Sequence, residues 1–365
     1  MTIDSKNDHE IFMKMRENYL LAKKNIPENF KSKHWDFFYE KFDQLIETRS
    51  LWERMLRNSL TIGFNDNLIE VSNQRFLKKK ENLWAELQSG SINDLIQENY
   101  DEKYIENKLI LLNQIISATD LKFVLNNSIT NIGNPVVNKF DINFKGEKYS
   151  INFNDHDAGD LYHAWLILLK LKIFEKKKSI ICEIGGGYGG LISKIKSEIV
   201  CARVIMLDLP EVNASQTYYL SKVFHDKIIL GYKDFLDKGI EILKDDFDFL
   251  ILPGWIANQL PKDSVDVFIN IRSMMEMSKP NLDFYFQMIQ NSLKVDGIFA
   301  CFNRYQKLVG GIENKFIEYP FDDDWKTLLS QHSIFQPHIH QLILKRLKKN
   351  SGFQFREELS NIEKN

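Results

Sequence analysis

Residues 180–191 read IICEIGGGYGGL, and this stretch decides the fold. Ile180, Ile181 and Cys182 form the short apolar run that is typical of a buried strand. Five glycines follow within six positions, at 185, 186, 187, 189 and 190, and a helical pattern begins at Leu191. Glycine lets the backbone turn sharply and approach a ligand without a Cβ in the way. A strand, a glycine loop and a helix in this order predict a nucleotide-binding turn in an α/β sheet.

Short apolar runs alternate with amphipathic segments on both sides of this loop. The alternation predicts a parallel sheet with helices on both faces, an α/β fold of the Rossmann-like class. The expected strands are residues 179–184, 202–207, 247–252, 265–270, 297–302 and 338–345. The expected helices include residues 158–174, 191–199, 282–293 and 324–329. We expect the last strand to be an antiparallel edge strand and the polar tail from Lys348 to fray.

The N-terminal third of the chain has a different character. Residues 34–56 and 107–123 carry aromatic and aliphatic side chains at helical spacing, which predicts amphipathic helices. Alternation on both sides of Lys145-Gly146 predicts a β-hairpin over residues 139–153. We therefore expect a helical domain over 1–132, a Rossmann-like domain over 133–350 and a polar tail over 351–365.

Composition limits the class of protein. The 365 residues suit two domains, and 48 basic against 50 acidic residues give no general attraction to nucleic acid or anionic membrane. The N-terminus lacks a signal-peptide pattern, and the longest apolar stretch, residues 164–174, is shorter than the roughly 20 residues that span a bilayer. Cys182, Cys201 and Cys301 form no C-x-x-C and are expected to be buried single thiols. These features predict a cytoplasmic protein that binds neither nucleic acid nor membrane.

The loop fits both G-x-G-x-G and G-x-G-x-x-G, so its glycines alone do not select a cofactor. Glu183 stands two residues before the first glycine, where a carboxylate can hold the ammonium of a methionine moiety but would repel a pyrophosphate. The chain also has only one such α/β unit, without a second nucleotide-binding half. Both features favour S-adenosylmethionine over a dinucleotide. The alternative is that Glu183 caps the amides of the loop.

Asp208 ends the second expected strand and is followed by Leu209, Pro210 and Glu211. A carboxylate at this place can accept hydrogen bonds from both ribose hydroxyls. Pro210 suits the first turn of a helix, so Asp208 can also cap that helix. The two roles are compatible.

An ordered set of motifs resembles a family of bacterial sugar O-methyltransferases. The motifs are CEIGGGYGGL at 182–191, DLPEV at 208–212, LPGW at 252–255, DVFIN at 266–270, MMEM at 274–277 and FNR at 302–304. The resemblance covers roughly residues 133–304 and implies a class I methyltransferase fold and methyl transfer to a sugar hydroxyl. The Asp208 element is also similar to plant-type small-molecule O-methyltransferases, whose aspartate holds the ribose and whose catalytic histidine follows the fourth strand. Met275 and Glu276 stand where that histidine is expected.

The third strand also departs from many enzymes of this class, because it ends in LPGW without an acidic residue for the adenine amino group. Trp255 can pack on the adenine or belong to the core. The expected cofactor-binding residues are Glu183, Gly185, Gly186, Gly187, Gly189, Asp208, Leu209, Trp255 and Asn270.

Methyl transfer to a sugar hydroxyl needs a base, because the hydroxyl is a very weak acid. Glu276 is the first candidate; it follows the fourth strand, and neighbouring methionines would raise its pKa. The alternative is a capping box formed by Ser273 and Glu276. His163, on the helix before the glycine loop, is the second candidate because histidine titrates in the useful range, and His156 is a weaker one.

Other residues concern the acceptor. Tyr162 is expected to contact the substrate, and Arg304 to bind an acidic or phosphate group or else to make a surface ion pair. We expect no metal site, since Glu276 is the only carboxylate after the fourth strand and the acidic run 322–324 suits a solvated turn and helix start.

The sequence therefore predicts a methyltransferase with a sugar or sugar-nucleotide acceptor. The alternatives are methylation of another small hydroxyl or phosphate-bearing acceptor, and a module that binds S-adenosylmethionine without catalysis. A helical N-terminal domain is also compatible with a homodimer.

Overall fold

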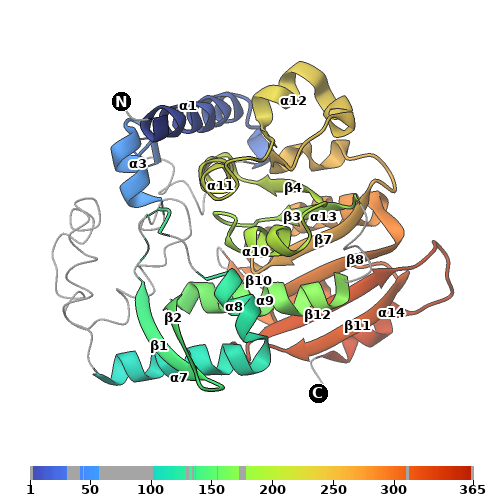
Figure 1. Cartoon of the computed structure of the whole chain (residues 1–365). Helices are drawn as coiled ribbons and strands as arrows, with labels where there is room; N and C mark the ends of the chain where they lie inside the picture. Colours follow the sequence, from blue (N-terminus) through green and yellow to red (C-terminus); the bar gives the residue numbers. More distant parts are fainter. Residues whose placement is uncertain are drawn as a thin grey trace.

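The computed structural model describes residues 3–30, 42–43, 45–56, 102–128, 131–133, 135, 137–153, 155–171, 178–309 and 312–362. At its centre is an eight-stranded sheet with helices on both faces (Figure 1). Its strands are β3 (Ile180–Ile184), β4 (Arg203–Asp208), β5 (Ile229–Leu230), β6 (Phe249–Pro253), β7 (Val265–Ile271), β8 (Leu293–Arg304), β11 (Trp325–His332) and β12 (Ile339–Arg346).

Helices connect or flank these strands. The α-helices are α1 (Ile3–Lys24), α3 (Arg49–Met55), α7 (Glu102–Ala118), α8 (Leu121–Asn126), α9 (Asp155–Leu171), α10 (Gly190–Glu198), α11 (Pro210–Val223), α12 (Tyr232–Lys238), α13 (Lys279–Ser292) and α14 (Phe355–Ser360). Short 3₁₀ turns are η1 (Glu28–Phe30), η5 (Gly239–Lys244), η6 (Gly254–Gln259), η7 (Met274–Glu276) and η8 (Phe316–Glu318). None of the described helices is long and apolar enough to cross a membrane.

The parallel part of the sheet runs β5-β6-β4-β3-β7-β8. Numbered along the chain without the two-residue β5, the strands have the 3-2-1-4-5 order of a doubly wound sheet, so the expected Rossmann-like α/β fold is confirmed. The order reverses between β3 and β7, and in such sheets ligands bind beyond the carboxyl ends of the strands at that point. The glycine loop leaves β3 at this edge.

The last two strands depart from expectation. The antiparallel strand predicted near the C-terminus is β12, but it lies between β8 and β11, so β11 forms the edge. The helix predicted over residues 324–329 is wrong, because this segment begins β11. The register shifts between Thr327 and Leu329, which interrupts the alternation that identifies a strand in a sequence.

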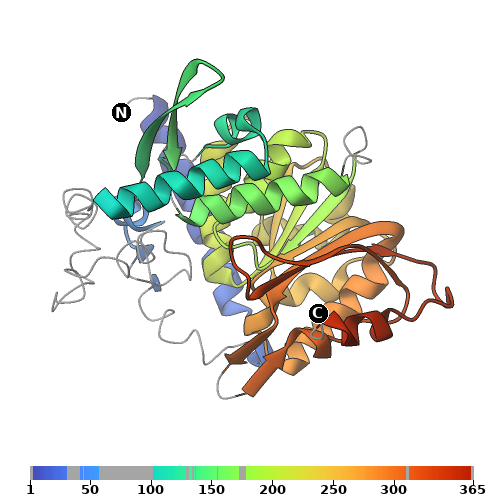
Figure 2. The same cartoon turned by 90° about the horizontal axis from the view of Figure 1, so that it is seen from below.

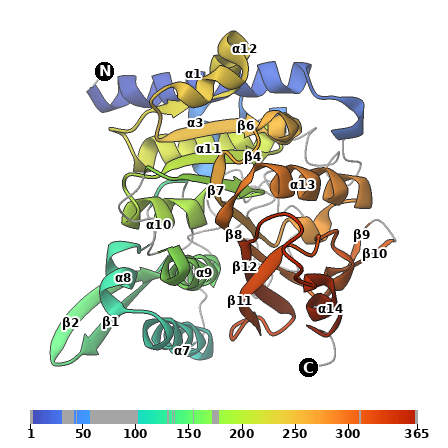
Figure 3. The same ribbon diagram turned by 90° about the vertical axis from the view of Figure 1, so that its right-hand side faces the viewer.

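The sheet separates two hydrophobic cores. Figure 3 shows the sheet and the helices packed on it from another side. Along β3, Ile181 faces the core under α9, α10 and α11, while Cys182 and Ile184 face the core under α12, α13 and α14. Cys182 and Cys301 are buried as expected, but Cys201 is exposed after α10, so its predicted burial is wrong.

The N-terminal helix α1 packs along α11 and α12. α7 packs on α9, and α8 begins at Asp120, whose carboxylate accepts a hydrogen bond from the Phe123 backbone N–H at 3.1 Å. Of the helical segment expected over 34–56, residues 34–41 and 44 lie outside the described residues. The predicted division into domains stays a prediction.

Two hairpins lie outside the main sheet. The hairpin expected over 139–153 is confirmed as β1 (Asn138–Phe144) and β2 (Glu147–Phe153), and it projects from the body of the protein (Figure 2). A second hairpin, β9 (Gln306–Val309) and β10 (Ile312–Lys315), follows β8 directly.

The polar tail contains a packed helix. Phe355 and Leu359 of α14 are 1% and 2% exposed, so this part of the tail belongs to the core and is not the frayed end that was expected. The acidic run before β11 also has structural roles: Asp322 forms an ion pair with Arg346, and Asp324 accepts hydrogen bonds from the backbone of residues 350 and 351. The prediction of a solvated turn and helix start is therefore wrong.

Candidate active site

The glycine loop between β3 and α10 has a backbone that only glycine adopts readily. Gly185, Gly187 and Gly189 have φ of 69°, 56° and 97°. A Cβ on Gly185 would also lie 2.0 Å from Ser273 Oγ. The expected glycines therefore form a tight turn at the carboxyl end of β3, and the side chain of Ser273 packs against Gly185.

Glu183 lies directly below this loop. Its side chain is 1% exposed, and a Cβ on Gly186 would lie 2.4 Å from its Oε2. Among the described residues this Oε2 has no hydrogen-bond partner. Burial, together with the charges of Asp160 and Asp208, raises the pKa of Glu183 well above its usual value.

Asp208 completes this acidic group from the end of β4. Its Oδ1 accepts the Leu209 N–H at 2.8 Å and its Oδ2 accepts the Gln216 amide at 3.0 Å. Burial raises the pKa of Asp208 to about 7, although amides of Gly186, Gly187, Leu209 and Gln216 favour its ionised form. Leu209 is half-buried at the N-terminus of α11, and Asp208 binds the Leu209 N–H directly.

Asp160 brings a third carboxylate to the loop from α9. Its side chain is 7% exposed and lies within 2.5 Å of where a Cβ on Gly190 would stand. Sequence reasoning did not select Asp160, because it precedes the loop by a whole helix and a connection. Three buried carboxyl groups lie around one turn, and the pKa of Glu183 is raised partly by the charges of the other two; a cationic ligand would offset this repulsion, whereas a pyrophosphate would increase it.

Asn270 supports the loop from β7. Its side chain is fully buried; Nδ2 donates to Ile184 O at 2.9 Å, and Oδ1 accepts from Met274 N at 3.2 Å and from Asn303 Nδ2 at 2.9 Å. These bonds join the ends of β3, β7 and β8, so the residue has a structural role beneath the site. Its expected contact with the cofactor stays a prediction.

Trp255 lies at the end of β6, in η6, and is half-buried. It contacts Tyr232 and Phe30 edge-on, with ring centroids 6.1 and 6.2 Å apart. The preceding Gly254 has no room for a side chain, because its Cβ would lie 2.1 Å from Tyr285 Oη. Tyr285, from α13, is a neighbour of Asp208 that the sequence did not reveal.

Glu276 lies in η7 after β7 and forms an ion pair with Lys307 of β9. Met274 and Met275 point into the core, at 0% and 6% exposed, so they do not form the apolar surroundings expected for this carboxylate. The alternative capping box does not form either, since the Ser273 side chain makes no capping bond and donates to Ile184 O at 3.1 Å.

His163 and Tyr162 lie on α9, near the carboxyl edge of the sheet. His163 is 3% exposed and packs edge-on against Phe302 of β8 at 5.3 Å between ring centroids. Tyr162 packs edge-on against Phe335 at 4.9 Å, and burial raises the pKa of its phenol. His156 is in α9, but its side chain lies outside the described residues.

Arg304 is exposed at the end of β8 and forms no ion pair with any described residue, which contradicts the surface ion pair considered as an alternative. Arg272, which sequence reasoning did not select, follows the neighbouring strand β7 and has a φ of 62°. Two positively charged residues, Arg272 and Arg304, therefore lie beyond β7 and β8, next to the acidic residues at the ends of β3 and β4.

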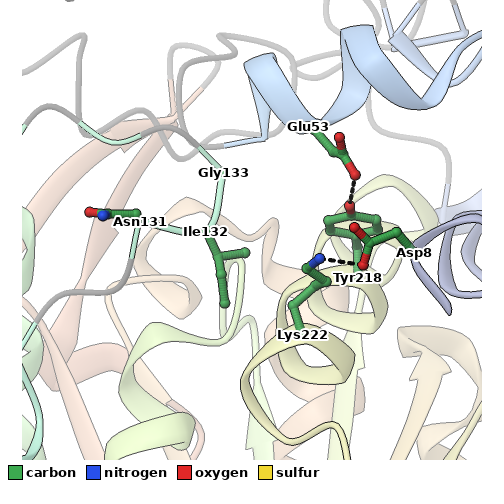
Figure 4. A pocket seen from close by; sticks show the side chains of 7 residues that line it. All are labelled: Asp8, Glu53, Asn131, Ile132, Gly133, Tyr218 and Lys222. Atoms are coloured by element: carbon green, nitrogen blue, oxygen red, sulfur yellow. Dashed lines mark hydrogen bonds and ion pairs between the residues drawn. The ribbon is translucent and has the colours of Figure 1, made fainter. Parts of the chain in front are cut away.

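A cavity of about 400 Å³ lies away from this edge, between α1, α3 and α11 (Figure 4). In it the Tyr218 hydroxyl donates to Glu53 at 2.5 Å, and Lys222 forms an ion pair with Asp8. None of its lining residues belongs to the glycine loop.

The chain is similar to known proteins in structure and not in sequence. The chain matches no protein-family profile and no curated protein sequence. Among solved structures, the mitomycin 7-O-methyltransferase MmcR matches with 14% identity and a TM-score of 0.32, over 52% of this chain and 57% of that chain. An O-methyltransferase family protein from Burkholderia thailandensis matches with 11% identity and a TM-score of 0.34, over 53% of this chain and 60% of that chain. A SAM-dependent methyltransferase from Aquifex aeolicus has 12% identity and a TM-score of 0.33, over 53% of this chain and 94% of that chain.

Proposed function

We propose that this protein is an S-adenosylmethionine-dependent O-methyltransferase whose acceptor is a hydroxyl of a sugar or sugar nucleotide. The observation that carries the proposal is the buried Oε2 of Glu183, which has no described partner beneath the glycine loop. Burial of an unpaired carboxylate oxygen costs free energy, which a hydrogen-bond donor or a cation would offset. The ammonium of a methionine moiety supplies both.

The residues of the loop fit the rest of the cofactor. Asp208 would hold the ribose hydroxyls, and the backbone of Gly185, Gly186, Gly187 and Gly189 would face the cofactor. Trp255 and Leu209 would border the adenine. Bound S-adenosylmethionine would supply an activated methyl group, so the protein has to provide orientation and a proton acceptor.

Two side chains are candidates to accept the hydroxyl proton. Glu276 is half-exposed beyond β7, and one of its carboxylate oxygens forms an ion pair with Lys307. His163 is buried against Phe302, so an acceptor would have to reach it from the carboxyl edge. Loss of a general base lowers the rate by roughly 10² to 10⁴-fold.

The first experiment measures cofactor binding. Isothermal titration calorimetry with S-adenosylmethionine and with NAD should give binding for the first compound alone, and Glu183→Gln should weaken it. Binding of NAD, or unchanged affinity in Glu183→Gln, would contradict the proposed cofactor.

The second experiment measures methyl transfer to a panel of sugars and sugar nucleotides, with Glu276→Gln, His163→Ala and EDTA controls. We expect one of the two variants to lose transfer while keeping cofactor affinity. Full activity in Glu276→Gln would remove it as the base. Cofactor binding without transfer to any acceptor would indicate a non-catalytic binding module.

A further inference from the structure

Three basic residues lie close together beyond β7 and β8. Arg272 follows β7, and its backbone N–H donates to Phe302 O of β8 at 2.7 Å. Arg304 ends β8 and pairs with Ile339, the first residue of β12. His338 directly precedes β12, and its carbonyl oxygen accepts the Tyr305 N–H at 3.2 Å. Strand pairing alone therefore brings these three residues to one place.

The charges at this place are unbalanced. Partial burial and the charges of Arg304 and Arg272 lower the pKa of His338, and no carboxylate of the described residues opposes this shift. Neither arginine forms an ion pair with a described residue, whereas Lys307 nearby is paired with Glu276. Two guanidinium groups without a counter-charge, beside an imidazole kept neutral, are suited to bind an anion.

The backbone of Arg272 is held in an unfavourable conformation. Its φ of 62° is uncommon for a residue with a Cβ, and such conformations are found disproportionately at functional sites. The hydrogen bonds of Asn270 on one side and the packing of Ser273 against Gly185 on the other fix this turn. Arg272 is thereby fixed next to the glycine loop, two residues from Asn270.

We propose that Arg272 and Arg304, with His338, bind a phosphate group of the methyl acceptor. This inference rests on the proposed function, which it narrows to phosphorylated acceptors. A planar guanidinium binds two phosphate oxygens at once, so two arginines fix both the position and the orientation of the group. The same chemistry occurs in a sugar phosphate and in a nucleotide diphosphate sugar.

The first test uses inorganic phosphate and pyrophosphate, with chloride at matched ionic strength as the reference, and follows the His338 imidazole by NMR. His338→Gln identifies the signal. We expect saturable binding that raises the pKa of His338, and about a tenfold loss of affinity in Arg304→Gln and in Arg272→Gln. Absence of saturable binding by either anion would overturn the proposal.

Arg356→Gln is the matched control. Arg356 is exposed on α14, and its backbone N–H donates to Asp323, just before β11. The start of β11 lies beside the end of β12, away from the carboxyl end of β8 where Arg304 stands. The control should bind phosphate as the unaltered protein does. Equal losses in Arg356→Gln and Arg304→Gln would show that only net charge matters, and the proposal would be wrong.

The second test identifies the source of the phosphate. Glucose, glucose 1-phosphate and UDP-glucose are compared in calorimetry, and we expect at least one phosphorylated compound to bind about tenfold more tightly than glucose. The more tightly bound of the two distinguishes a sugar phosphate from a nucleotide sugar, whereas three equal affinities would contradict the proposal. S-adenosylmethionine is titrated into the same variants, and unchanged cofactor affinity with lost phosphate affinity supports both proposals. Failure of the cofactor to bind the unaltered protein refutes the proposed function, whereas the phosphate-binding site itself is refuted only by the loss of saturable phosphate binding.

Discussion

At the scale of single residues, positions in and around the glycine loop are restricted either by steric space or by buried charge. Gly186 is restricted by space, since its Cβ would lie 2.4 Å from Glu183 Oε2 and 2.7 Å from Met206 Cε. Glu183 and Asp208 are restricted by charge, because burial raises the pKa of each. The two restrictions can be tested separately.

Gly186→Ala tests the restriction by space. The added methyl group must displace the Glu183 carboxylate, so we expect cofactor affinity to fall at least about tenfold. Gly159→Ala on α9 is the control, because nothing lies within 4 Å of its Cβ and alanine favours a helix; it should stabilise the protein by about 0.5–1 kcal/mol. Calorimetry and urea denaturation measure both effects, and unchanged cofactor affinity in Gly186→Ala would contradict this geometry.

Cofactor affinity should depend on pH through the ionisation of Asp208 and Glu183. The pKa of Asp208 is raised to about 7, so below pH 7 this carboxyl is mostly protonated in the free protein. A cationic ligand with ribose hydroxyls favours the ionised forms of Asp208 and Glu183, so its binding should release protons and weaken as the pH falls from 8 to 6. Calorimetry in two buffers of different ionisation enthalpy measures the proton release. Asp208→Asn should flatten the dependence, and proton uptake would contradict the argument.

Only part of this site could be read from the sequence. Glu183 and Asp208 directly follow or end apolar strand runs, so their place at the carboxyl edge follows from local pattern. Asp160, Arg272 and Tyr285 reach the site from other elements through the folding of the sheet. A single sequence contains no local signal for such contacts.

At the scale of elements, the buried strands were predictable and the edge strand was not. β3 and β4 are almost continuous apolar runs, because both faces of a parallel sheet are covered. β11 is half-exposed along most of its length and contains a register shift, so its pattern resembles a short helix as much as a strand. Strand pairing with β12, which is a long-range contact, determines its structure.

The contact between α1 and α11 contains a buried carboxylate. Glu211, in the first turn of α11, is 6% exposed, and burial raises its pKa to about 7, against the opposing attraction of Lys23. The folded protein therefore binds this proton more tightly than the unfolded chain does. The free energy of unfolding should fall as the pH rises from about 4.5 to about 7, since the carboxylate must ionise inside the contact.

Glu211→Gln removes this dependence. We expect the variant to be about 1–3 kcal/mol more stable than the unaltered protein at pH 8, with a smaller difference at pH 5. Urea denaturation at the two pH values measures the difference. Glu241→Gln, an exposed carboxylate of η5, should change stability by less than about 0.5 kcal/mol at both. A Glu211→Gln variant that is less stable at pH 8 would indicate that attraction to Lys23 outweighs burial.

At the scale of the whole molecule, α1 and the glycine loop contribute to one hydrophobic core. Met15 and Tyr19 of α1 belong to the same cluster as Tyr188 of the loop and Tyr218 of α11. Tyr188 and Tyr219 pack edge-on at 4.8 Å between ring centroids, which links the loop to α11. The N-terminal helix therefore covers α11 on the side away from the sheet, and its loss would expose apolar surface.

Met15→Ala and Met13→Ala test whether this core unfolds as a unit. Met15 is fully buried and Met13 is 44% exposed on the same helix, so the first substitution should cost about 2–5 kcal/mol and the second less than about 0.5 kcal/mol. Because α1 shares its core with α11, calorimetry should record one transition, moved to lower temperature as a whole in Met15→Ala. Bound S-adenosylmethionine should raise that same transition, since it binds the folded state alone. Two transitions, with Met15→Ala shifting one and the cofactor shifting the other, would mean that the N-terminal helices and the sheet are stable independently of each other.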